Sequence, residues 1–388
     1  MSEFQDGLVA LRRELHALPE LGLDLPRTQA AVLAALDGLP LEVSTGAGLT
    51  SVTAVLRGGR PGPAVLLRGD MDALPVTEST GLPFAGPEGA MHACGHDLHT
   101  AMLVGAARLL VERREELAGD VIFMFQPGEE GFSGARHMIE EGVLEAAGSA
   151  PVAAYALHVV SNILPSGIFV SRGGPAMAAA DRLLVTVRGR GGHGSSPHAA
   201  LDPIPAACEM VLALQTFVTR RFDVFDPVVL TVGRIAGGTA DNVIPGSVEF
   251  AATIRTFSKE SQALMEEGTV RLLRGIADGH GLDLDLEYRT DYPVTVNDHG
   301  EAAFAARALT EVFGDGRYVD SPRPFPASED FSFVLDRVPG AFILLGACPP
   351  DADPATAPMN HSPDAVFDEA VMTDGATALA ELALRRLR

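Results

Sequence analysis

In the first 178 residues, and again after residue 292, short apolar runs typical of strands alternate with longer stretches that have the hydrophobic spacing of a helix. Leu8, Leu11, Leu15 and Leu18 recur every three or four residues among charged ones, which predicts an opening amphipathic helix. Short apolar runs then alternate with longer helical patterns: the runs are at 52–57, 64–68, 121–125 and 153–160, and the helical patterns at 98–117 and 373–387. Strands that alternate with long helices predict an α/β fold with a mostly parallel sheet covered on both faces.

The pattern changes between residues 179 and 291. Strand-like and helix-like segments now follow in the order strand, helix, strand, strand, helix, strand, at 183–188, 203–220, 227–236, 244–256, 259–278 and 282–288. That order is typical of the ferredoxin-like split unit, which is a compact domain in its own right. The sequence therefore predicts a discontinuous domain of residues 1–178 and 292–388, with an inserted domain at 179–291.

Polar side chains stand at the ends of several predicted strands of the first domain. Asp70 and Asp72 follow one apolar run, Glu129 and Glu130 follow another, and His158 closes a third. Ligands of open parallel sheets bind outside the carboxyl ends of the strands. We therefore expect these five side chains to gather at one edge of the sheet.

Composition and charge exclude several classes of function. The 388-residue chain is 47% hydrophobic and carries a formal net charge of -22, which disfavours nucleic acid and anionic membrane surfaces as partners. No apolar stretch approaches the roughly 18 residues of a membrane helix, and the charged N-terminus does not read as a secretory signal. The three cysteines, Cys94, Cys208 and Cys348, are distant and odd in number. A cytoplasmic protein without a disulfide framework is expected.

The segment from Met91 to His99 concentrates metal-ligating side chains. It holds one thiol and three imidazoles within nine positions. Cys94 and His96 are two residues apart, so in an extended segment their side chains point the same way and can converge on one cation. A small buried cysteine beside ordinary loop histidines is the structural alternative.

Adjacent carboxylates form a second cluster. Glu129 and Glu130 lie on a glycine-flanked turn directly after an apolar run. Such a pair usually marks a solvated loop, but beside a metal site one carboxylate can bind the cation while its neighbour accepts a proton from water. Asp70 and Asp72 could ligate a metal directly or orient a ligating imidazole, and we favour the second role. His158, taken alone, reads as a satisfied core histidine.

Together these segments resemble one family. The chain is similar to the amidohydrolase branch of the M20 metallopeptidases, which includes hippurate hydrolases, N-acyl-amino-acid amidohydrolases and auxin-conjugate hydrolases. The resemblance covers nearly the whole chain, and its motifs occur in the order Gly69-Asp70-Met71-Asp72-Ala73-Leu74-Pro75, His92-Ala93-Cys94-Gly95-His96-Asp97, Gln126-Pro127-Gly128-Glu129-Glu130-Gly131, Gly191-Gly192-His193-Gly194 and Asn360-His361-Ser362-Pro363.

The resemblance implies a catalytic domain with two divalent metal ions, zinc or manganese first, with cobalt or nickel as further candidates. The implied ligands are Cys94, as a bridging thiolate, with His96, Glu130, His158 and His361. Asp70 and Asp72 stand where other branches of the family have a His-x-Asp motif, which leaves the metal's identity open.

The resemblance also implies roles for Glu129 and for the inserted domain. Glu129 matches the general base, and His193 matches a histidine that stabilises the oxyanion in M20 enzymes, often across a dimer. The inserted domain would then act as a lid and dimerisation domain of a homodimer or higher homo-oligomer. The implied reaction is hydrolysis of the amide bond of a small N-acyl amino acid or short peptide.

A free carboxylate on such a substrate would need a clamp, for which Asn242 and Arg255 are candidates. Arg255 alternates with the buried face of its predicted strand, so an ordinary surface charge is an equal alternative. Ser328-Glu329-Asp330-Phe331 also resembles a family segment, but the sequence assigns it no role.

Three other functions compete with this interpretation. A dipeptidase would use the same mechanism on a substrate with a free amine. A non-catalytic metal-binding protein would need neither Glu129 nor His193. The third is an oxidoreductase, because Gly189, Gly191 and Gly194 match the spacing of the dinucleotide-binding fingerprint. A true fingerprint opens directly into a helix, whereas here Pro197 and Pro203 intervene and the predicted helix starts too late.

Overall fold

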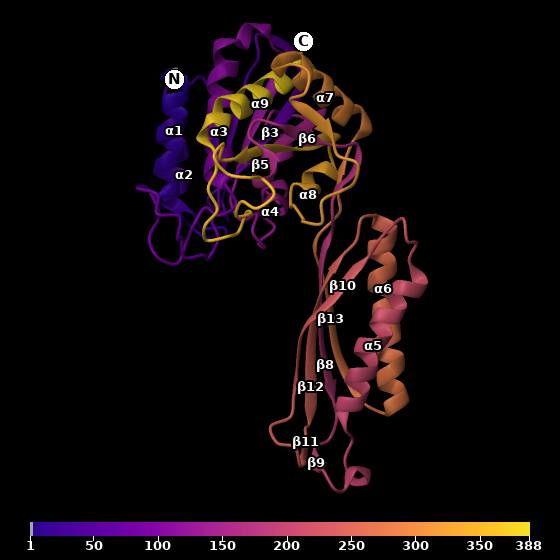
Figure 1. The fold of residues 1–388 in the computed structure, drawn as a ribbon. Coiled ribbons are helices and arrows are strands. Elements are labelled where there is room, and N and C mark those ends of the chain that lie inside the picture. The colour runs from indigo at the N-terminus through magenta and orange to yellow at the C-terminus, as the bar shows by residue number, and fades with distance from the viewer. Residues whose placement is uncertain (1–2) are drawn as a thin grey trace. The chain divides into compact units, whose positions relative to one another are not determined.

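The computed structural model describes residues 3–388, which fall into two compact units (Figure 1). The first unit comprises the chain up to Ala176, Val296–Arg323 and Asp330–Arg388. The second comprises Met177–Thr295 and Pro324–Glu329. The segment expected as an insertion, residues 179–291, lies within the second unit, which extends a few residues beyond it at each end.

An eight-stranded sheet forms the centre of the first unit, in the order β1-β2-β4-β3-β5-β16-β6-β15. Its four central strands, β4, β3, β5 and β16, are parallel, which confirms the predicted α/β class with a mostly parallel sheet. Antiparallel pairs occur toward the edges, between β1 and β2, β2 and β4, and β16 and β6. The strand bounds are Glu42–Thr45 (β1), Val52–Leu56 (β2), Arg60–Asp70 (β3), Ala118–Gln126 (β4), Ala153–Pro165 (β5), Phe169–Ser171 (β6), Tyr318–Asp320 (β15) and Gly340–Cys348 (β16).

The central strands are buried on both faces. Every residue of β16 is buried, and so are the last six of β4, because helices pack over the sheet. Parallel strands of this kind read as continuous apolar runs, which is why the sequence predicted β3, β4 and β5, although it did not single out β16. Two short strands, β7 (Gly174–Met177) and β14 (Thr295–Asn297), lie where the chain passes between the units.

The helices of the first unit pack in a connected layer around α3. Helix α3 contacts α1, α9 and β3, and most of its residues are buried, so it is apolar on nearly all sides. It ends at Glu112 rather than extending to residue 117 as expected, and a short 3₁₀ turn, Arg114–Glu116, follows. The helix bounds are Glu3–His16 (α1), Pro26–Leu36 (α2), His96–Glu112 (α3), Gly134–Glu140 (α4), His299–Phe313 (α7), Ser332–Leu335 (α8) and Met372–Arg386 (α9).

The second unit is a four-stranded antiparallel sheet in the order β10-β12-β8-β13, with α5 and α6 on one face (Figure 1). This arrangement confirms the predicted ferredoxin-like β-α-β-β-α-β order. A separate two-stranded ribbon joins β9 and β11. The bounds are Ala180–Arg188 (β8), Gly192–His193 (β9), Pro203–Arg221 (α5), Val229–Gly237 (β10), Val243–Ile244 (β11), Ser247–Arg255 (β12), Lys259–His280 (α6) and Asp283–Tyr292 (β13).

Local sequence signals fix where the two helices of the second unit begin and end. The Asp202 side chain accepts a hydrogen bond from the Ile204 backbone at the start of α5, and Pro203 occupies the first helical position. Ser258 caps α6 in the same way, and Gly281 ends that helix with a left-handed backbone, φ +66°. The apolar faces of both helices then cover the buried side chains of the sheet.

A buried carboxylate at the start of β8 makes the second unit sensitive to pH. Burial raises the pKa of Asp181 to about 6, although hydrogen bonds from Gln262 and Tyr288 oppose the shift. In the unfolded chain the pKa of Asp181 is about 4. Between about pH 4 and pH 6 the folded state therefore holds a proton on Asp181 that the unfolded state has lost. The cost of ionising Asp181 is therefore absent below about pH 4 and complete above about pH 6.

Replacing this carboxylate by the neutral Asp181→Asn should stabilise the protein at neutral pH, by up to about 3 kcal/mol. Thermal melts of the variant and the wild type across this pH range test the prediction. The gain should shrink to nothing as the pH falls to about 4. A difference that is the same at every pH would contradict it.

Candidate metal centre

Four segments of the first unit bring the sequence-predicted ligands together. Cys94 lies in the loop before α3 and His96 is the first residue of that helix, while His158 lies within β5. Glu130 follows the end of β4, and His361 lies in the loop between β16 and α9. Segments separated by more than 200 residues in the chain thus meet at one edge of the sheet.

Cys94 is the centre of the cluster. Its Sγ lies 3.4 Å from Nε2 of His158 and 3.3 Å from Nε2 of His361. Two groups of potential ligand atoms share this sulfur, with all atoms of each group within 4.8 Å of one another: Cys94 with His96 and His158, and Cys94 with Glu130 and His361. One thiolate is thus placed to contact two cations.

Two buried polar atoms of this cluster fit a bound cation. Neither ring nitrogen of His96 has a close hydrogen-bond partner among the described residues, although His96 is fully buried; carboxylate oxygens of Asp72 and Asp70 lie 3.4 and 3.5 Å from these nitrogens. Buried polar groups are normally satisfied, so such atoms point to a missing partner. Thiolate, imidazole and carboxylate together form the donor set that transition-metal cations prefer.

The histidines differ in protonation. Burial, and after it the nearby His99, lowers the pKa of His158 well below its usual range, so this imidazole is neutral and can ligate. Hydrogen bonds to Cys94 and Glu130 raise the pKa of His361 to about 10. A cation that binds His361 must therefore displace a proton, which couples binding to pH.

Gly95 allows Cys94 and His96 to face the same site. Its φ is +85°, and a Cβ at this position would lie 2.4 Å from Cγ2 of Val159 on β5. Any larger residue would strain the turn and push it away from His158, the neighbour of Val159. The glycine is thus required by both the turn and the close approach.

Asp70 and Asp72 hold the segments that carry the ligands. The carboxylate of Asp72 accepts hydrogen bonds from the backbone N–H groups of Glu129 and Glu130, both at 3.0 Å. Asp70 Oδ1 lies 2.6 Å from Nδ1 of His99, whose Nε2 accepts from the Val159 backbone at 2.8 Å. Asp72 thus holds the backbone of Glu129 and Glu130, and Asp70 holds His99, which is not one of the expected ligands; the role that we favoured for both carboxylates, to orient a ligating imidazole, stays a prediction.

Glu129 lies in the same cluster. Its carboxylate is within 4.8 Å of ligand atoms of His96 and Glu130, and the side chain is buried. Its Oε1 accepts a hydrogen bond from the Asp330 backbone at 3.4 Å. The carboxylate adjacent to a candidate ligand is thus also held beside the cluster.

Comparison with known proteins identifies the family. Residues 66–385 match the model of peptidase family M20/M25/M40. The chain belongs to this family. As an M20 protein it is 36% identical to the N-acetylcysteine deacetylase of Bacillus subtilis over 383 residues, covering 98% of this chain and 97% of the relative. It is also 36% identical to thermostable carboxypeptidase 1 of Saccharolobus solfataricus over 388 residues, covering 99% of this chain and 96% of the relative.

A solved structure of a Bacillus subtilis protein, described as a dinuclear metal binding peptidase from the M20 family, has the same fold. It superposes with a TM-score of 0.84 at 34% identity, covering 99% of this chain and 98% of that one. These findings confirm the resemblance to the amidohydrolase branch and show that the chain is a metal-dependent hydrolase. They also support a site for two metal ions, and the candidate ligands around Cys94 fit such a site.

A buried ionic network beneath the M20 site was not predicted from the sequence. Arg68 lies 2.7 Å from Oδ2 of Asp70 and 3.0 Å from Oδ1 of Asp330, and all three side chains are fully buried. Asp330 also accepts hydrogen bonds from the Gln126 side chain and the Ala135 backbone. Asp330 belongs to the segment Ser328-Glu329-Asp330-Phe331, which resembled a family segment but had no assigned role. This segment therefore anchors the strand ends that carry Asp70 and Glu129. Its acidic pair was the only signal in the sequence.

The remaining candidates of the M20 enzyme lie in the second unit. His193 on β9 pairs with Val243 on β11, and the Asn242 carbonyl accepts from the Gly194 backbone at 2.8 Å. The structure thus brings His193 and Asn242 together. Arg255 ends β12, whose other end is nearest β11, so it is separated from Asn242 by the length of that strand.

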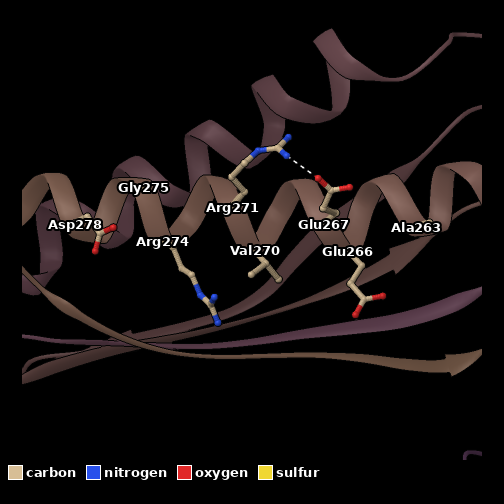
Figure 2. Close-up of a pocket in the computed structure, with 8 residues that line it drawn as sticks. All are labelled: Ala263, Glu266, Glu267, Val270, Arg271, Arg274, Gly275 and Asp278. Carbon is tan, nitrogen blue, oxygen red and sulfur yellow. Dashed lines mark hydrogen bonds and ion pairs between the residues drawn. The ribbon is translucent and has the colours of Figure 1, made fainter.

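A hollow of about 790 Å³ lies along one face of α6 (Figure 2). Its charged side chains are carboxylates and guanidinium groups, and Arg271 forms an ion pair of 2.8 Å with Glu267, one turn away on the same helix. It has no imidazole or thiol, so it does not offer the ligand set found around Cys94. The lining residues are Ala263, Glu266, Glu267, Val270, Arg271, Arg274, Gly275 and Asp278.

Proposed function

We propose that this M20 enzyme hydrolyses the amide bond of N-acyl amino acids. The observation that carries the proposal is the position of Cys94, whose single sulfur belongs to two groups of candidate ligands beside the buried carboxylate of Glu129. Two relatives support the substrate class, because one is named as a deacetylase of N-acetylcysteine and another as a carboxypeptidase. Both names describe cleavage at an amino acid.

The geometry supports two sites for metal ions. Cys94, His96 and His158 would hold one cation, and Cys94, Glu130 and His361 the other. When bound, divalent cations supply Lewis acidity that activates water and polarises an amide carbonyl. Zinc, manganese, cobalt and nickel are the candidates; the thiolate and imidazoles favour the softer members of this group.

Glu129 would act as the general base and then the general acid. Its carboxylate takes a proton from the attacking water as the new carbon–oxygen bond forms, and returns it to the amine nitrogen as the carbon–nitrogen bond breaks. Asp72 and the Asp330 backbone hold this residue from two sides. Such support keeps the base oriented during turnover.

His193 and Asn242, both in the inserted unit, would bind the substrate. An imidazole N–H can stabilise the oxyanion, and an amide can bind the free carboxylate of the amino acid. The side chain and backbone of Ser195 both lie within hydrogen-bond distance of Nδ1 of His193, at 2.8 and 3.1 Å, which leaves Nε2 for substrate. Arg255 remains an alternative for the carboxylate.

The inserted unit would also form a homodimer. Its exposed apolar side chains support an interface, among them Leu212, Val224 and Phe225, which are 69%, 81% and 93% exposed. Sedimentation velocity should give the mass of a dimer or higher oligomer, and a monomer at all concentrations would contradict this. All three cysteines are free. None of the described helices is long and apolar enough to cross a membrane.

The experiment that tests the proposed function compares N-acetyl and N-benzoyl amino acids with dipeptides. Protein stripped of metal is resupplied with zinc, manganese, cobalt or nickel and assayed for release of the free amino acid. Metal-restored cleavage of the acylated compounds is the expected result. Cleavage of dipeptides alone would favour a peptidase, and no cleavage despite bound metal would favour a non-catalytic metal-binding protein.

A further inference from the structure

The side chain of Asn360 connects three segments of the candidate metal centre. Its Nδ2 donates to the backbone carbonyl of Cys94 at 3.2 Å and to that of Val159 at 3.0 Å. Its Oδ1 accepts from the backbone N–H of Ser161 at 2.9 Å. The Ser161 hydroxyl, whose one hydrogen can go to this Oδ1 at 3.0 Å or to the Pro358 carbonyl at 2.8 Å, lies beside it. The amide thus uses both its donor hydrogens and at least one acceptor lone pair.

Each contact of Asn360 lies next to a proposed ligand. Cys94 is a ligand itself, Val159 follows His158, and Asn360 precedes His361. The same Nδ2 also lies 3.8 Å from the sulfur of Cys94. Asn360 therefore relates three of the five ligands to one another.

The backbone at His361 shows that this loop must be held. His361 has φ +73°, a region that residues with a Cβ rarely adopt. Its N–H donates to the carbonyl of Ala93 at 2.9 Å, and Asn360 supplies the neighbouring side-chain contacts. Without them the chain could relax toward an ordinary φ, which would turn the imidazole away from Cys94.

We propose that Asn360 is a positioning residue that fixes the spacing of Cys94, His158 and His361 and thereby sets the affinity of the centre for its cations. The inference rests on the proposed function, because it assumes that these three side chains bind metal. Aspartate has the same shape but cannot donate to the two carbonyls, so Asn360→Asp removes the donors without leaving a cavity.

The test measures Co²⁺ binding by competition with a chromophoric chelator, together with the thiolate-to-cobalt absorption band. Asn360→Asp and Asn360→Ala should each weaken binding about 10- to 100-fold and change the band, as losses of partners to metal ligands do. Met359→Ala is the matched control, because this neighbouring side chain is 61% exposed. It should bind Co²⁺ as the wild type does.

Melting of the metal-free proteins separates positioning from folding. If Asn360→Ala does not fold, Asn360→Asp carries the test alone. Wild-type affinity and an unchanged band in a folded Asn360→Asp would overturn the inference. A wild type that binds no Co²⁺ at all would instead overturn the proposed function on which it rests.

Discussion

Glu129→Gln is expected to lower kcat about 100- to 10,000-fold, the range that general acid–base catalysis contributes. Glutamine keeps the size of the side chain and can still accept from the Asp330 backbone, but it cannot take a proton from water. Steady-state kinetics on the best N-acyl amino acid would measure the loss. KM should change little, because Glu129 has no proposed part in binding substrate.

Metal content distinguishes this loss from damage to the site. Glu129→Gln should retain the metal of the wild type, whereas Glu130→Gln should lose metal along with activity because Glu130 is a proposed ligand. A Glu129→Gln enzyme with kcat close to that of the wild type would show that another group moves the proton.

Arg68→Met should destabilise the protein by about 3–5 kcal/mol, the usual cost of removing one partner from a buried ion pair. The substitution keeps the apolar stem but leaves the carboxylates of Asp70 and Asp330 without their cationic neighbour in a fully buried site. Arg68 also holds the pKa of Asp70 well below its usual range, against the opposing effect of burial. Denaturant unfolding of the metal-free protein would measure the change.

Arg57→Met is the control for Arg68→Met. Arg57 also pairs with two carboxylates, Glu42 and Asp120, but its side chain is 41% exposed. Exposed pairs contribute about 0–1 kcal/mol, so this variant should unfold nearly as the wild type does. Equal losses in the two variants would mean that burial of the Arg68 network adds nothing to stability.

Sequence periodicity was sufficient to predict the main elements of the second unit and three of the four central strands of the first, β3, β4 and β5; it did not place β16 or α7. The central strands are continuous apolar runs because helices cover them, and β8 and β12 alternate because only one face of their sheet is covered. The short strands β6 and β15 were not predicted, since three residues carry too little pattern. The sheet order was also not predicted, because strand pairing depends on contacts far apart in the chain.

The candidate site, too, was only partly predicted from the sequence. Cys94, His96 and Glu130 stand in short motifs whose composition already indicated metal binding. The roles of Arg68 and Asn360 could not be found from sequence. Arg68 lies in a run that otherwise reads as a plain buried strand, and its partner Asp330 is 262 residues away. Asn360 reads as a loop residue until its contacts with Cys94 and Val159 are known.

The most direct test of the account is the number of metal ions bound per chain, measured by elemental analysis of wild type and Cys94→Ala. The wild type should bind two ions. Because the sulfur belongs to both groups of ligands, Cys94→Ala should lose affinity at both sites rather than at one. Two ions retained at wild-type affinity without the thiol, or only one ion in the wild type, would contradict a centre built around Cys94.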